Sequence, residues 1–478
     1  MSQNVLVIGA GPAGLAAAVA ARAAGARVTM LDSSDYLGGQ YWRHLPAERP
    51  SQDEERLHHG WGKFTKLRSA LEADAGCEIV TSAQVWSIEN YGGGAFGDDS
   101  AARHEVHVLV GPPDGINREN RSYTPDSIVM ATGAHDRTLP FPGWDLPGVF
   151  SAGAAQAMAK GERVAVGQRV VVAGAGPFLL PVATSLSQVG ATVLGVYEAS
   201  RLGSLITGWL PQPWQLIGAS GKATELIEYV GNHLRHRIPY RIGHAVIAAN
   251  GTDRVESVTI AAVDAKWSPI PGTEKTIAAD AVCVSHGFTP RLELPIAVGC
   301  DLSAERFVLI DDAQQTSVAS VYAAGEITGI GGVDAALAEG TIAGHCAAGG
   351  SSRDETIAGA VKRRVTFTGF ASRIEAAHGI RSDWVNWLKE DTLVCRCEEV
   401  TYGKLRATGK RTEAQGLRSQ KLSSRAALGI CQGRICGRSV EDIMCRETPG
   451  GLIDGASIDR RPIVTPIRLG ELAGEATK

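Results

Sequence analysis

The stretch Asn4-Val5-Leu6-Val7-Ile8-Gly9-Ala10-Gly11-Pro12-Ala13-Gly14 decides the fold of this chain. Its four consecutive apolar residues predict a buried parallel strand, and the alanine-rich run Leu15–Ala24 predicts a helix. Between them, Gly9, Gly11 and Gly14 have the G-x-G-x-x-G spacing, which gives a tight turn, room for a pyrophosphate and close helix–strand packing. The N–H groups that start such a helix bind phosphate oxygens, so the stretch predicts a dinucleotide site.

A second predicted strand supports this interpretation. Arg27–Leu31 is followed by Asp32, eighteen residues after Gly14, where a carboxylate can accept hydrogen bonds from a ribose. An ordinary βαβ unit would not need all three glycines. The sequence therefore predicts a Rossmann-like α/β fold at its start.

Composition limits the class of protein. A chain of 478 residues exceeds one compact core, and length alone predicts roughly two to four domains. A hydrophobic content of 44% and a net charge of −4 predict a soluble protein that binds neither nucleic acid nor anionic membranes broadly. Residues 5–21 lack the basic start of a signal peptide, and no apolar run is long enough to span a membrane. We expect a cytoplasmic location, with or without peripheral membrane association.

The opening pattern recurs in the middle of the chain. Val170–Pro177 is again a strand with a G-x-G turn, made by Gly174 and Gly176, and the strand Thr192–Tyr197 delivers Glu198 where Asp32 stands in the first unit. Two residues depart from the pattern: Leu179 occupies the third glycine position, and Pro181 falls about one turn into the expected helix. The sequence leaves open whether a second nucleotide binds here. Glu198 favours a free ribose, hence NAD over NADP.

Further glycine turns follow other predicted strands. They are Gly38–Trp42, which includes Gly39 and Gln40, then Ala131-Thr132-Gly133 after the strand 128–130, and Gly325-Glu326 before a helix over Val333–Ala347. Short strand-like runs between residues 77 and 130 predict a β-meander inserted in the doubly wound fold.

Together these motifs make residues 1–350 resemble the two-dinucleotide-domain flavoproteins. The resemblance implies FAD in the first site, held by Gly9, Gly11, Pro12, Ala13, Gly14, Asp32, Gly39, Gln40, Ala131, Thr132, Gly133, Gly325 and Glu326. Disulfide reductases of that family carry a cysteine pair near the flavin. None stands at 38–44 or 130–160 here, which argues against dithiol chemistry.

Four cysteines near the C-terminus predict a metal centre. Cys395 and Cys397 form a C-x-C pair, and after 33 residues Cys431 and Cys436 form a C-x4-C pair. Zinc sites usually use C-x2-4-C in both pairs, so the C-x-C pair favours a 2Fe–2S cluster over zinc. Ten Lys and Arg against three acids between residues 396 and 438 would stabilise such a cluster. Without a secretory signal, the other five cysteines are expected to be structural thiols.

With these cysteines, the C-terminal segment resembles the bacterioferritin-associated ferredoxin type of 2Fe–2S domain. The whole chain resembles the large (A or α) subunits of opine oxidases, hydrogen cyanide synthase and dye-linked proline or hydroxyproline dehydrogenases. That resemblance implies a role in electron transfer within a larger complex. The partners would be a smaller amine-oxidising flavoprotein (β) subunit and a quinone or other respiratory acceptor. Some relatives also have a small 2Fe–2S (γ) subunit or an interfacial FMN.

The expected architecture has two Rossmann-like domains, one nested in the other, and a small α-helical 2Fe–2S module. The expected parts are an FAD domain at 1–155 and 288–350, a second nucleotide domain at 156–287, a linker at 351–391, the 2Fe–2S domain at 392–445 and a tail at 446–478.

Two other functions compete with this interpretation. A self-contained reductase would bind NADH at Gly174–Glu198 and pass single electrons to a partner through the cluster. A redox-sensing or assembly scaffold would keep the flavin only as a vestige. No catalytic side chains for amine oxidation stand out, and His44, His135 and His286, near glycine turns, are expected to be structural.

Overall fold

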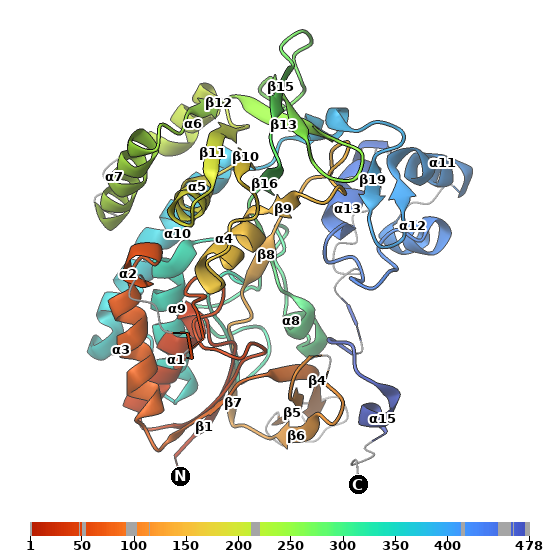
Figure 1. Ribbon diagram of the computed structural model, residues 1–478. Coiled ribbons are helices and arrows are strands. Elements are labelled where there is room, and N and C mark those ends of the chain that lie inside the picture. The colour runs from red at the N-terminus through yellow and green to blue at the C-terminus, as the bar shows by residue number, and fades with distance from the viewer. Residues whose placement is uncertain are drawn as a thin grey trace. The chain divides into compact units, whose positions relative to one another are not determined.

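The computed structural model describes residues 2–46, 48–49, 54–91, 103–113, 115–211, 220–412, 416–447, 460–461 and 463–473 (Figure 1). The chain divides into two compact units. The first unit comprises Met1–Ala134, Pro290–Ala371 and Arg460–Lys478, and the second comprises His135–Thr289 and Ser372–Asp459. Across the described ranges, no helix has both the length and the apolar composition needed to span a membrane.

The first unit is built on a five-stranded parallel sheet. Its strand order is β18-β7-β1-β2-β3, from β18 (Val321–Ala323), β7 (Ser127–Met130), β1 (Asn4–Ile8), β2 (Arg27–Leu31) and β3 (Cys77–Val80). Neighbouring strands pair in parallel, as the short buried apolar runs predict. Most of the residues of these strands are buried, so the fingerprint stretch forms the centre of the sheet.

Two glycine-containing helices pack closely in this unit. They are α1 (Pro12–Ala23) and α9 (Gly332–Ala347). A Cβ added at Gly340 would lie 2.0 Å from the carbonyl oxygen of Ala13, and one at Gly344 would lie 1.9 Å from that of Ala17. The two backbones therefore approach each other more closely than any side chain would permit.

The remaining elements of the first unit surround this sheet. An antiparallel meander contains β4 (Ala83–Tyr91), β5 (Arg103–Val110) and β6 (Glu119–Tyr123). The expected meander over residues 77–130 was too wide, because β3 and β7 at its two ends belong to the parallel sheet. The other helices are α2 (Glu54–Leu57), α3 (Trp61–Glu72), α8 (Glu293–Val298), η2 (Glu355–Ile357) and α15 (Leu469–Leu472).

The second unit repeats the parallel design. Its sheet order is β12-β11-β10-β16-β9, from β12 (Tyr240–Ile242), β11 (Thr192–Glu198), β10 (Arg169–Gly174), β16 (Ala281–Ser285) and β9 (Val149–Ser151). Its helices are α4 (Ala152–Gly161), α5 (Leu179–Gln188), α6 (Leu202–Trp209) and α7 (Ser220–Arg235), and its antiparallel sheet joins β13 (His244–Asn250), β14 (Ser257–Ala262) and β15 (Lys275–Ala278). Two Rossmann-type folds are thus confirmed.

The C-terminal segment belongs largely to the second unit. Its elements are α10 (Ala358–His378), which starts in the first unit, then η3 (Ser382–Trp387), β19 (Leu393–Cys395), β20 (Val400–Thr401), α11 (Tyr402–Thr412), α12 (Leu417–Ser424) and α13 (Gly437–Glu447). The expected linker at 351–391 is largely helical. The compact units place the cysteine segment with the second nucleotide fold, while the predicted domain boundaries stay predictions. Most of the expected tail, residues 448–459, 462 and 474–478, lies outside the described residues.

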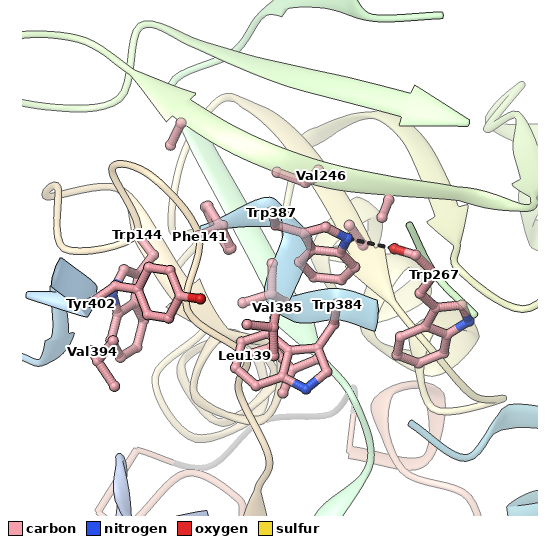
Figure 2. Close-up of a cluster of buried hydrophobic side chains, with 14 of the residues drawn as sticks. Leu139, Phe141, Trp144, Val246, Trp267, Trp384, Val385, Trp387, Val394 and Tyr402 are labelled. Atoms are coloured by element: carbon pink, nitrogen blue, oxygen red, sulfur yellow. Dashed lines mark hydrogen bonds between the residues drawn. The ribbon is translucent and has the colours of Figure 1, made fainter. Parts of the chain in front are cut away.

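One apolar core joins the cysteine segment to the second nucleotide fold (Figure 2). Trp384, Val385 and Trp387 of η3 are buried in it, and the Trp387 indole N–H donates to the Trp267 carbonyl at 2.8 Å. Leu139 and Phe141, from the second unit's N-terminal part, lie in the same cluster. The cysteine segment is therefore an integral layer of the second unit.

Candidate cofactor and iron–sulfur sites

The first glycine loop forms a bare backbone surface. Gly9 has φ +105°, and a Cβ there would lie 2.3 Å from the Ala131 carbonyl oxygen, while a Cβ on Gly14 would lie 1.7 Å from the Gly9 carbonyl oxygen. At Gly11, by contrast, a Cβ would touch only the Gly39 Cα, at 4.0 Å. Space therefore remains beside Gly11, which fits the close approach of a pyrophosphate.

The predicted ribose ligand closes this loop. The Asp32 carboxylate accepts hydrogen bonds from the backbone N–H of Ala10 at 2.6 Å and of Ser34 at 2.7 Å, one on each oxygen. A carboxylate has about four acceptor positions, so Asp32 can accept further hydrogen bonds.

Other predicted flavin contacts meet the same loop. A Cβ on Gly39 would lie 2.8 Å from the Gly11 Cα, and one on Gly325 would lie 2.9 Å from the Ala13 Cβ. Pro12 is the first residue of α1. Gln40 is exposed. The hydroxyl of Thr132, the residue before Gly133, donates to the Arg291 carbonyl at 2.9 Å. The structure thus brings Gly9, Gly11, Ala13, Gly39, Ala131 and Gly325 together.

Two carboxylates support the Gly325 turn. Glu339 of α9 accepts from the Gly325 N–H at 2.8 Å and from the Thr328 hydroxyl at 2.6 Å. Glu326 accepts from the Gly332 N–H at the start of α9, at 2.9 Å. Burial raises the pKa of each carboxyl to about 7. Glu339 was missed at the sequence level, although a glutamate inside an alanine-rich helix is a usable signal for a buried polar role.

The second glycine loop differs from the first in where its helix starts. α5 begins at Leu179, three residues after Gly176, whereas α1 begins directly after Gly11. Pro181 therefore lies in the first turn of α5, where its missing N–H costs little. The buried Leu179 fills the third glycine position. A Cβ added at Gly174 would lie 1.7 Å from the Ser285 carbonyl oxygen, so this position still requires glycine.

The Glu198 carboxylate is enclosed by its own chain. One oxygen accepts from the Gly176 N–H at 2.9 Å and the Tyr240 hydroxyl at 3.2 Å. The other accepts from the Ser200 N–H at 3.0 Å and lies 3.5 Å from the His378 Nδ1. Burial alone would raise the pKa of Glu198, but these partners outweigh it and hold the pKa below its ordinary value.

The α10 end reinforces this enclosure. The Trp209 indole N–H donates to the His378 Nε2 at 3.2 Å, which leaves the His378 proton on Nδ1, toward Glu198. A Cβ on Gly208 would lie 2.5 Å from the Ala377 nitrogen, so α6 and α10 touch through a glycine. His378 could not be found from sequence, because it lies 180 residues from Glu198.

The four predicted cluster cysteines meet as a ring. The Cys397 sulfur lies 4.0 Å from the Cys395 sulfur and 3.7 Å from the Cys431 sulfur, and the Cys436 thiol hydrogen-bonds with Cys395 and Cys431. Two thiolates on one tetrahedral metal at about 2.3 Å would be roughly 3.8 Å apart, so these two separations are those of ligands on a single metal. In the described ranges, no group of three or more His, Cys, Asp and Glu side chains is arranged to hold a metal ion.

The surroundings of the ring favour the thiolate form at two of its four cysteines. Burial raises the pKa of Cys397 to about 11, and the hydrogen bonds to Cys395 and Cys431 raise that of Cys436. Hydrogen bonds from the Cys436 thiol, followed by backbone N–H groups, lower the pKa of Cys395 to about 6 and that of Cys431 to about 4. A Cβ on Gly429 would lie 2.7 Å from the Cys397 sulfur, so only glycine allows this loop to reach it. Four thiols, donor N–H groups and a bare glycine are what an anionic iron–sulfur cluster needs.

Polar contacts fix the cysteine segment on the second nucleotide fold. The His135 Nε2 lies 3.0 Å from the Arg434 carbonyl oxygen, and Arg137 pairs with Asp442 at 2.6 Å. The Trp144 indole N–H donates to the Leu393 carbonyl at 2.6 Å, and the Arg396 guanidinium lies 5.2 Å from the Trp144 ring centre. His135, expected only to be structural, therefore holds the loop of the second cysteine pair.

The other two singled-out histidines have local partners. The His44 Nδ1 lies 2.8 Å from the Trp42 carbonyl oxygen. His286 is buried beside Trp267 and Trp387, and burial lowers its pKa to about 3. Burial suits a neutral imidazole at His286, and the local partners of both histidines suit a structural role.

Comparisons with known proteins agree with this organisation. Residues 3–340 match the family model described as pyridine nucleotide-disulphide oxidoreductase. The chain is 31% identical to an opine oxidase subunit of Rhizobium meliloti, over 98% of this chain and 87% of that protein. It is 30% identical to the hydrogen cyanide synthase subunit HcnB of Pseudomonas protegens, over 91% of this chain and 90% of that protein. Its fold resembles a crystal structure of L-proline dehydrogenase from P. horikoshii, with a TM-score of 0.64, 20% identity and coverage of 99% and 79% of the two chains.

Proposed function

Because the chain belongs to the pyridine nucleotide-disulphide oxidoreductase family, a family of oxidoreductases, we propose that it is the electron-transfer subunit of a heteromeric dehydrogenase acting on CH–NH or CH–NH2 bonds. Two relatives that it matches over most of their length are named as subunits, of opine oxidase and of hydrogen cyanide synthase. The observation that carries the proposal is the meeting of four cysteines packed on the second nucleotide fold, and we propose these cysteines as the ligands of a one-electron centre.

We assign FAD to the first glycine loop. The Gly11 backbone leaves room for the pyrophosphate, Asp32 keeps acceptor positions for the ribose, and Gly325 lies against Ala13 of α1. We assign a 2Fe–2S cluster to Cys395, Cys397, Cys431 and Cys436. When bound, FAD accepts a pair of electrons and the cluster handles them one at a time, which is what a protein between an amine oxidiser and a quinone or other acceptor requires.

The protein's own residues prepare both sites. Glu339 holds the Gly325 N–H and so fixes the turn before α9, while Glu326 occupies the first N–H of that helix. Around the ring, the Cys436 thiol and then backbone N–H groups lower the pKa values of Cys395 and Cys431, which favours their thiolate forms. Burial of Cys395 and Cys436 keeps water from half of the ring.

The enclosed Glu198 disfavours the NADH-reductase alternative. This carboxylate accepts three hydrogen bonds from its own chain and lies 3.5 Å from the His378 Nδ1, so a ribose would have to compete with Tyr240 and His378. The third glycine is also replaced by Leu179. We therefore propose that the second nucleotide fold serves as a support for the cysteine segment and does not bind NAD.

The first experiment is anaerobic addition of NADH to the purified chain, followed through the flavin absorption band. We expect no bleaching with NADH, and bleaching when an amine-oxidising partner is added together with an opine, glycine or proline-type amine. Rapid bleaching by one equivalent of NADH would overturn the proposal in favour of the reductase. A colourless protein without iron would favour the scaffold.

A matched pair of variants tests the cluster assignment. Cys397→Ser should lower iron and sulfide content and abolish the iron–sulfur absorption while flavin content stays unchanged. Cys300→Ser, a buried cysteine of the first unit, is the control and should retain both. Unchanged iron in Cys397→Ser would contradict the assignment.

The same proposal includes the partner subunits and the cellular location of this protein. We propose a β subunit that oxidises the amine and, where present, a γ subunit with its own 2Fe–2S centre, with an FMN at an interface between subunits. The amine is bound in the β subunit, so this chain does not select among opines, amino acids and imino acids. A cytoplasmic location completes the proposal.

A further inference from the structure

The cysteine ring has a buried side and an exposed side. Cys395 and Cys436 are almost fully buried, whereas Cys397 is exposed and Cys431 is half-buried. A cluster bound in this ring would therefore approach solvent only at Cys397 and Cys431. Electron transfer between proteins needs short distances, so this is the side from which an electron would leave.

An apolar surface surrounds that side. The loop Arg425–Cys436 contacts Cys397 through Gly429, and the residues on either side of Gly429 are Leu428 and Ile430. Ile430 is 89% exposed and Leu428 40% exposed. Ile435, on the same loop, is 47% exposed. Exposed aliphatic side chains gathered around a functional site mark an interaction surface, because their exposure to water is unfavourable and a partner that covers them removes that free-energy cost.

The segment of sequence that contains the ring is basic. Residues 396–438 hold ten Lys and Arg against three acids, a net charge of +7 in a chain whose total is −4. Arg396, next to Cys397, is exposed and lies over the Trp144 ring, which fixes its orientation. Arg425 pairs with Glu398 at 2.7 Å and still exposes much of its side chain. Such a field attracts an acidic partner and orients it before contact.

We propose that Leu428, Ile430 and Ile435, with the basic residues around them, form the docking surface for an acidic one-electron carrier protein that exchanges electrons with the cysteine ring. This rests on the proposed function, because it needs a redox centre at Cys395, Cys397, Cys431 and Cys436. It adds the class of partner and the face on which that partner binds. Aliphatic centres with a charged rim are usual for such interfaces.

The test uses the loaded full-length protein with a plant-type 2Fe–2S ferredoxin as an acidic probe. Binding of the oxidised proteins is measured by calorimetry, and electron transfer from the reduced protein by stopped-flow absorption. We expect binding that weakens as salt increases, and a weaker interaction with cytochrome c, a basic carrier. Ile430→Glu should raise the ferredoxin Kd on the order of tenfold or more. Ile227→Glu, which changes another largely exposed isoleucine on α7, 71% exposed, should leave it unchanged.

The outcomes separate the two proposals. If wild-type protein holds no iron–sulfur cluster, the proposed function fails. If the cluster's absorption is intact but Ile430→Glu and Ile227→Glu bind ferredoxin equally, only the docking surface is overturned. It is also overturned if Ile430→Glu converts a dimer to a monomer in light scattering, or if it abolishes binding to anionic vesicles while ferredoxin binding persists. Those results would assign the face to a second copy or to a membrane.

Discussion

The absence of a side chain at Gly340 allows α9 to pack directly on α1 in the first unit. A Cβ there would lie 2.0 Å from the Ala13 carbonyl oxygen of α1. We expect Gly340→Ala to lower the free energy of unfolding by about 1–3 kcal/mol and to reduce bound flavin, because α1 must shift. Gly231→Ala, mid-helix in α7 with open space around it, should instead stabilise the protein by up to about 1 kcal/mol. Urea unfolding of both variants checks this, and equal effects would contradict it.

His286 couples the second unit to pH. Burial lowers the pKa of this imidazole from 6.5 to about 3. The unfolded chain therefore binds a proton that the folded chain does not, between those values. Stability is complete above pH 6.5 and falls as pH drops toward 3, by about 1.4 kcal/mol per pH unit from this group. His286→Phe should remove that part of the slope, as measured by urea unfolding between pH 6.5 and 4. An unchanged slope would show that His286 does not carry it.

At the residue scale, the sequence predicts the bare glycine loop better than its surroundings. The spacing of Gly9, Gly11 and Gly14 predicts both β1 and α1, because each glycine answers a local steric need. Glu198 was predicted to face a ribose. Its enclosure by His378 and Tyr240 depends on contacts distant in sequence, for which no local pattern exists.

Among the elements, η3 (Ser382–Trp387) holds the cysteine segment. Trp387 is buried in the shared core and donates to the Trp267 carbonyl. Trp387→Ala should cost about 3–5 kcal/mol, since it leaves a cavity and an unpaired carbonyl. We also expect faster loss of iron to a chelator. Leu422→Ala, at an exposed position of α12, should change neither. If Trp387→Ala retained iron as well as wild type, packing of this core would not contribute to cluster stability.

Element types were predictable where periodicity was strong. β2 has the bounds that its apolar run predicts, β11 ends one residue later than expected, and α9 starts one residue earlier than expected. The start of α5 was not predictable, because a glycine fingerprint that has lost its third glycine no longer fixes where its helix begins.

For the whole molecule, two compact units imply two unfolding events. Calorimetry of the loaded protein should show two transitions, since multidomain chains rarely unfold in one step. Removal of iron should lower only the transition of the second unit, which contains all four ring cysteines, because a ligand stabilises the unit that binds it. Removal of flavin should lower only the other. A single transition that responds to both would contradict this division.

No pattern in the sequence predicted that the cysteine segment packs on the second nucleotide fold. Trp144 bonds to Leu393 and Arg137 to Asp442 across 249 and 305 residues. Composition and spacing describe neighbours along the chain. They therefore predicted a linker at 351–391, part of which the structure buries in a core.

The interleaved order of the two units has a consequence for synthesis on the ribosome. β7 pairs with β18, so the central sheet of the first unit lacks a strand until residue 323 has emerged. The second unit awaits its cysteine segment, whose last ring cysteine is Cys436. At about 5–20 residues per second, the stretch from β1 to β18 takes roughly 16–64 s to emerge, and the first unit stays open for that time. Nascent chains of this protein should therefore depend on chaperones, and iron can fill the ring only after residue 436 has emerged.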